Sequence, residues 1–187
     1  MPPKQKVTKD MLLEHAFQIA KEQGIMAVTS RSVAKAANCS IQPIFTHFPT
    51  MQELRKATFA YASNKLMQDI LQYQGSPDFI IQTNIWMLNL ARNESKLFEL
   101  LYLSDSFDSP NLWEVMMQWE CNRAMLSAVA AKYGLSQTEC QDVFQRGFFM
   151  LFGIAAMLAK GKIEISNDEA IDMVQRTFSQ MVGSMKG

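Results

Sequence analysis

Few side chains in this sequence are placed to act as acids, bases or nucleophiles. The 187 residues include two histidines, His15 and His47, both within the first 50 positions. The sequence contains no glycine-rich phosphate loop, no HExxH zinc motif and no GxSxG nucleophile motif. Its acidic pair Asp168 and Glu169 falls at a predicted helix start, where the helix dipole stabilises negative charge. We therefore expect no enzyme, no cofactor and no metal site.

The distribution of charge favours contact with a polyanion at one end of the chain. Over the whole sequence 18 basic residues balance 18 acidic ones, but residues 1–60 hold eight Lys or Arg against four Asp or Glu. This N-terminal segment carries a formal charge of +4, and the remainder carries −4. A basic segment on an acidic body suits phosphate contact, although a solvated surface without a partner produces the same imbalance.

The cysteines and the apolar runs bear on the cellular compartment. Three cysteines, Cys39, Cys121 and Cys140, are widely spaced and form no CxxC pair, which is typical of a reducing, cytoplasmic compartment. Residues 1–10 are polar, unlike the apolar region of a signal peptide. The longest uncharged run, residues 147–159, is shorter than the roughly 18 residues of a membrane span, so we interpret it as a buried helix. We interpret Cys39 as a packing residue rather than a redox switch.

Helix starts are marked along the chain by residues that cap helices. A Ser, Thr or Asn side chain accepts a hydrogen bond from the unpaired N–H groups of a first turn, and Pro is tolerated there. Starts of this kind occur at Thr8, Thr29, Ser40, Thr50, Ser76, Asn93, Ser109, Ser136 and Ser166. Three of them are complete capping boxes with a glutamate three residues later: Thr50, Ser136 and Ser166. The sequence therefore predicts an all-α fold of about nine helices.

The first three predicted helices, in residues 8–48, have the spacing of a helix-turn-helix. Asn38 supplies a tight turn before the third helix, which directs Ile44 and Phe48 inward at a spacing of four. Two short helices joined by such a turn and braced by a longer helix insert their last helix into the major groove of DNA. The side chains left outward on that last helix are Gln42, Pro43, Thr46 and His47.

These residues resemble the DNA-binding segment of the TetR family of bacterial transcriptional regulators. The similarity runs from about residue 8 to residue 59 and is carried by residues 16–24, 29–34, 39–40, 45–48 and 52–54. The resemblance implies an N-terminal three-helix DNA-binding domain joined to a larger helical-bundle domain. It also implies a homodimer that binds a palindromic operator and rearranges when a small ligand enters the C-terminal part.

Four positions depart from the family pattern. Ser30 replaces an apolar residue, Asn38 the turn glycine, Phe45 a tyrosine and Met51 a lysine. The last two changes remove groups that contact phosphates, so we expect weaker binding more than altered sequence choice.

The resemblance also assigns a set of side chains that face DNA: Arg31, Gln42, Pro43, Thr46 and His47. Gln42 can offer a bidentate amide to adenine, and Pro43 can contact a thymine methyl group. The other three suit phosphates or a base edge. For His47 a hydrogen bond at the edge of the core is an equal alternative.

The last two predicted helices are the expected dimer interface. The run 148–158 is apolar nearly all the way round, so it must be covered on several sides. In the family these helices pair with their symmetry mates as a four-helix bundle. The interface set is Phe148, Phe152, Gly153, Ala156, Val174, Phe178 and Met181. A monomer core that uses the same faces is the alternative.

Aromatic and methionine side chains in the middle of the chain suggest a ligand pocket. The sequence contains 14 methionines, and flexible thioethers line adaptable apolar sites well. The candidate ligand contacts are Trp86, Leu90, Phe98, Tyr102, Trp113, Met117 and Phe149. Ordinary core packing is the alternative for each of them. An apolar or aromatic effector is favoured over a highly charged one.

The sequence thus favours a cytoplasmic transcriptional regulator that binds double-stranded DNA, with no membrane partner. We expect a DNA-binding domain in residues 1–50 and a ligand-sensing and dimerisation domain in residues 51–187. The expected mechanism is repression that is released by a small effector. The alternative is a helical adaptor that binds only protein, which would not retard DNA in a gel.

Overall fold

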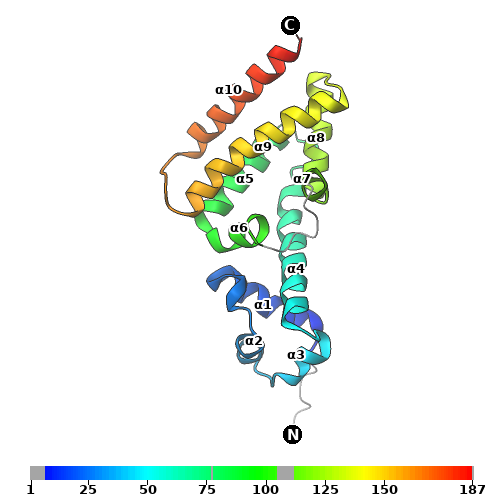
Figure 1. Cartoon of the computed structure of the whole chain (residues 1–187), viewed down its shortest axis with the longest axis vertical. Helices are drawn as coiled ribbons and strands as arrows, with labels where there is room; N and C mark the ends of the chain where they lie inside the picture. Colours follow the sequence, from blue (N-terminus) through cyan, green and yellow to red (C-terminus); the bar gives the residue numbers. More distant parts are fainter. Residues whose placement is uncertain (1–6, 77, 105–111, 187) are drawn as a thin grey trace. The chain divides into compact units, whose positions relative to one another are not determined.

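The computed structural model describes residues 7–76, 78–104 and 112–186, which are mostly α-helical (Figure 1). Within these ranges there is one short 3-10 turn and no strand. The predicted all-α fold is therefore confirmed.

Two compact units make up the chain. Of the described residues, 7–65 and 96–104 form an N-terminal unit, and 66–76, 78–95 and 112–186 form a C-terminal unit. The unit boundary therefore lies within the long fourth helix, between Lys65 and Leu66. The functional division at residue 50 stays a prediction.

The N-terminal unit is built from the first elements of the chain and one later helix. It contains α1 (Lys9–Gln23), the 3-10 turn η1 (Ile25–Ala27), α2 (Ser30–Ala36), α3 (Gln42–His47), most of α4 (Met51–Leu71) and α6 (Ser95–Tyr102). Helix α1 contacts both η1 and α2, and α2 contacts α3. The core is tight at the centre of this arrangement, where Leu12, Val33 and Ile44 are fully buried.

The C-terminal unit is a helical bundle around α9. It contains α5 (Phe79–Asn93), α7 (Leu112–Met117), α8 (Glu120–Tyr133), α9 (Gln137–Ala159) and α10 (Asn167–Lys186). Helix α9 packs against α5, α8 and α10. By length and apolar composition it is the one helix of the described residues that reaches the threshold for a membrane span. Its packing against three helices covers only part of this apolar surface: Leu151 and Ala155 are buried, whereas Phe149 and Met157 are exposed, so the buried helix predicted for residues 147–159 is confirmed only on one side.

Side-chain caps open several helices where the sequence predicted them. The hydroxyl oxygen of Thr8 accepts a first-turn N–H of α1 at 3.2 Å, and Thr29 caps α2 together with Ser32. The predicted boxes at Ser136 and Ser166 pair reciprocally with their glutamates at the starts of α9 and α10. These contacts are local, so residue spacing alone predicts them.

The helix predicted from Ser109 corresponds to two helices. Its predicted start lies outside the described residues, and α7 and α8 are separated at Gln118 and Trp119. Trp119 occupies the N-cap position of α8, and its side chain does not cap the helix. Neither a glycine, a proline nor a capping side chain marks this break, so the sequence pattern did not indicate it.

Candidate nucleic-acid interface

The turn between α2 and α3 is held in the conformation that a helix-turn-helix needs. Asn38 has a positive φ of 49°, which asparagine tolerates better than most residues. Beyond it, the Cys39 N–H donates to the Ala34 carbonyl at 3.0 Å and closes the end of α2. Asparagine thus adopts, at the position of the family's turn glycine, a left-handed conformation that glycine also favours.

Helix α3 has a buried side and an exposed side. Ile44 is fully buried and Phe48, directly after the helix, is 3% exposed, as the spacing predicted. Gln42 and Thr46 are exposed, and Pro43 is half-buried. The Thr46 hydroxyl donates to the backbone carbonyl of Gln42 at 3.0 Å. This bond does not use the Gln42 amide, so the exposed amide is available to a partner. Arg31, on α2, is also exposed.

Two apolar side chains of this segment are exposed although the sequence reading did not include them among the DNA contacts. Ile41 is 49% exposed and Phe45 is 43% exposed. They are four residues apart, so they lie on one side of the segment. Spacing alone could not separate them from the inward Ile44 and Phe48, because residues three apart are also neighbours on a helix surface.

His47 is partly engaged within the chain. Its Nε2 lies 3.3 Å from the Val7 carbonyl oxygen, and the side chain is half-buried. This is the hydrogen bond at the core edge that the sequence left open. The Lys9 Nζ lies 5.5 Å from the centroid of the Phe48 ring, so the start of α1 and the end of α3 are joined at this edge.

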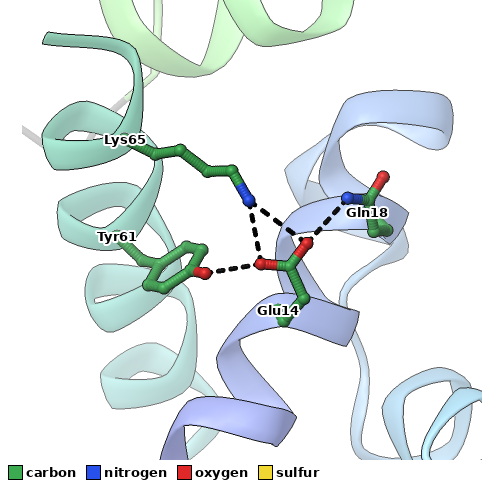
Figure 2. Close-up of polar contacts among 4 residues, drawn as sticks. All are labelled: Glu14, Gln18, Tyr61 and Lys65. Atoms are coloured by element: carbon green, nitrogen blue, oxygen red, sulfur yellow. Dashed lines mark hydrogen bonds and ion pairs between the residues drawn. The ribbon is translucent and has the colours of Figure 1, made fainter. Parts of the chain in front are cut away.

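Polar contacts attach α4 to α1 within the N-terminal unit (Figure 2). The Tyr61 hydroxyl donates to a Glu14 carboxylate oxygen at 2.5 Å, and the Lys65 Nζ lies 3.0 Å from the same oxygen. Gln18 donates to the other carboxylate oxygen at 2.9 Å. Hydrogen bonds from Tyr61, Gln18 and Lys65 lower the pKa of Glu14 from 4.5 to about 2.

A second contact attaches α4 to the loop before α2. The Arg55 Nε donates to the Val28 carbonyl at 3.3 Å. The Glu14 contacts and this bond fix α4 to α1 and to the loop before α2, while α1 packs against α2 as the longer brace that the sequence predicted. The arrangement can present α3 to a major groove as a fixed surface.

The fold and this surface define the chain as a helix-turn-helix DNA-binding protein. Residues 12–58 match the family model of the bacterial regulatory proteins of the tetR family. No curated protein matches the chain at a significant level. A solved structure, the multidrug binding protein EbrR complexed with imidazole, is similar in fold at a TM-score of 0.62 and 17% identity. That similarity covers 90% of this chain and 88% of the other.

The chain therefore carries the DNA-binding domain of the bacterial regulatory proteins of the tetR family. The family match falls on the residues whose spacing predicted it, and it lies within the N-terminal unit.

The residues predicted to form a dimer interface fall into two groups. On α9, Gly153 is exposed and Phe148, Phe152 and Ala156 are half-buried, as is Met181 on α10. Val174, by contrast, is 7% exposed and packs inside its own unit. The Phe178 ring centroid lies 5.1 Å from that of Tyr133 on α8. The apolar face of α10 that holds Val174 and Phe178 is therefore used by the unit itself, which the pattern alone could not distinguish from a partner.

The seven predicted ligand contacts are not gathered around one described cavity. Phe98 and Tyr102 lie on α6 in the N-terminal unit, whereas the C-terminal unit holds Trp86, Leu90, Trp113, Met117 and Phe149. Phe98 is fully buried and Phe149 is 52% exposed. Two cavities in the C-terminal unit, of about 460 and 220 Å³, are lined by none of the seven. That the seven predicted residues bind a ligand stays a prediction.

Proposed function

We propose that this regulator is a cytoplasmic homodimeric repressor that leaves a palindromic operator when a small apolar or aromatic effector binds. The observation that carries the DNA-binding half is the exposed side of α3, on a turn and helices held by the contacts above. The match to a family of regulatory proteins favours binding over catalysis.

The exposed side of α3 supports a mixed polar and apolar readout of the major groove. The Gln42 amide can pair with an adenine, while Ile41 and Phe45 can pack against thymine methyl groups. Phe45 has no hydroxyl for a phosphate, so its exposed ring is better used on base edges. Arg31 and Thr46 then contact the phosphate backbone. His47, whose Nε2 lies at the Val7 carbonyl, can donate to a phosphate through Nδ1–H only as the imidazolium.

An exposed apolar stripe on α9 supports the dimer. Phe149 is 52% exposed and Met157 is 47% exposed, and Gly153 lies midway between them at a spacing of four. A Cβ added at Gly153 would meet nothing within 4 Å, so the glycine is not required by its own protomer. A second helix can approach closely over such a residue, which explains a glycine at this point of a helix.

Helix α4 is the element proposed to couple effector and operator. It is continuous from Met51 to Leu71 and contributes residues to both units. An effector that favours another position of α4 would move the two N-terminal units of the dimer. Their α3 helices would then no longer match operator half-sites about 34 Å apart. The structurally similar EbrR is described as binding multiple drugs, which agrees with an apolar effector site in the C-terminal unit.

Selection of bound fragments from the source genome tests this proposal. The recovered fragments should share an inverted repeat, and binding should weaken steeply as salt is raised. A protein-binding adaptor would enrich no fragment at any salt concentration. Fragments that bind without any shared sequence would contradict the assignment of α3 as the reading helix.

A further inference from the structure

A cavity of about 220 Å³ lies in the C-terminal unit, bounded by the start of α5, the end of α8 and the middle of α10. It lies away from the residues that the sequence assigned to ligand. Its lining includes Val174 and Phe178, the two side chains of α10 that serve their own unit rather than an exposed interface.

The inner wall of this cavity suits a flat apolar ring. Val174 is 7% exposed, and the isoleucines Ile80 and Ile81 are half-buried beside it. The rings of Tyr133 and Phe178 lie 5.1 Å apart at an interplanar angle of 55°. Aromatic rings attract one another in tilted arrangements at such distances, so a third ring can be added to this pair.

One buried polar side chain, Asn84, opens into the cavity and has no hydrogen-bond partner among the described residues. Asn84 is 8% exposed, and among the described residues its carboxamide makes no hydrogen bond. Its neighbour Thr83 is equally buried at 7%, but the Thr83 hydroxyl donates to the Phe79 carbonyl at 2.8 Å. Because Asn84 lines the cavity, a ligand there that offers a hydrogen-bonding group can pair with its carboxamide and gain affinity.

The mouth of the cavity carries no net charge. Asp78 and Lys132 are both exposed there, together with the uncharged side chains Gln175 and Ser179. For comparison of size, a dry cavity of about 150 Å³ accommodates a benzene molecule. This cavity therefore has room for one ring with a polar substituent.

We propose that this cavity binds an uncharged, single-ring aromatic molecule with one hydrogen-bonding group, of the phenol class. The ring lies against Tyr133 and Phe178, and the polar group pairs with the Asn84 carboxamide. The binding of this ligand does not depend on the proposed function. Only the further step, that the ligand is also the effector, rests on the proposed function.

The test uses the full chain with isotope-labelled isoleucine methyl groups and titration with phenol, benzene and benzoate. Phenol should shift the Ile80 and Ile81 signals and leave Ile19 and Ile44 of the N-terminal unit unchanged. Calorimetry should give phenol at least about fivefold tighter binding than benzene or benzoate. DNA binding is not part of this measurement, so its failure and that of DNA binding are distinguishable.

Variants assign the contacts. Asn84→Leu should weaken phenol binding about tenfold and leave benzene binding unchanged, whereas Thr83→Val should alter neither. Val174→Phe should fill the cavity and abolish binding, with Met173→Phe, its exposed neighbour, as the control. Should Val174→Phe prevent folding, the Asn84→Leu comparison still decides. Unmoved Ile80 and Ile81 signals, equal affinities for benzene and phenol, or phenol binding unaffected by Asn84→Leu would each overturn the proposal.

Discussion

Gln42 illustrates how much depends on one exposed side chain at the scale of a residue. Its backbone carbonyl is occupied by the Thr46 hydroxyl, while its side chain is exposed near the start of α3. Gln42→Ala should cost about 1 to 3 kcal/mol at one operator position and relax the base preference there. Competition binding against operators with single substitutions measures this, with Gln23→Ala, exposed at the end of α1, as the control. Unchanged affinity together with unchanged preference would show that another residue reads that base.

The Glu14 carboxylate makes the N-terminal unit sensitive to acid. Its folded-state pKa of about 2 lies below the ordinary 4.5, so its stabilisation is complete above pH 4.5 and is lost as the pH falls toward 2. Its side chain is 41% exposed, so solvent screening limits the effect to about 1 kcal/mol at neutral pH.

Urea unfolding of Glu14→Gln and wild type checks this dependence. The two proteins should differ at pH 7 and converge as the pH falls through about 2, because the wild-type carboxylate becomes protonated in that range. Glu22→Gln, an exposed acid on the same helix, should show no comparable difference at pH 7. A stability gap for Glu14→Gln that stays constant with pH would assign the effect to packing instead of charge.

At the scale of the element, local signals were sufficient for several helix starts but not for others, such as α3, whose N-cap is Ile41 rather than the predicted Ser40, nor for helix environments. The capping residues Thr8, Thr29 and Ser136 fixed three starts, because a cap depends on neighbours within a few positions. The break at Trp119 carries no such signal. Whether Val174 faces its own unit or a partner depends on contacts distant in sequence, which periodicity does not encode.

The exposed apolar stripe of α9, formed by Phe149, Gly153 and Met157, leads to a prediction about the dimer. Gly153→Arg should convert a dimer at micromolar concentration to a monomer, because the new side chain projects into the helix approach and adds charge to an apolar surface. Since a Cβ there meets nothing within 4 Å, the protomer should keep its helical content.

Sedimentation with circular dichroism checks both statements. Gly147→Arg is the matched control, on the same helix but off the stripe and equally free of neighbours within 4 Å of an added Cβ. A dimeric Gly153→Arg protein with normal DNA binding would place the interface elsewhere.

At the scale of the whole molecule, the N-terminal unit was the part most open to prediction. Its family match spans residues 12–58. In this segment the requirement to present α3 constrains the side-chain types, their spacing and the position of the turn. The membership of α6 in this unit was not predicted, because its buried residues Leu97, Phe98 and Leu101 are brought there by long-range packing. The seven candidate ligand contacts come from both units, because the sequence pattern does not show which unit each helix joins.

Fluorescence anisotropy of a selected operator, titrated with the protein at several salt concentrations, tests the central claim most directly. Two protomers should bind each operator, and the affinity should fall by about 10³-fold or more between 50 and 200 mM salt. An unrelated duplex of equal length should bind much more weakly at every salt concentration. Equal affinities for the two duplexes would contradict the account of α3 as a reading helix, and a single protomer per operator would contradict the account of the dimer.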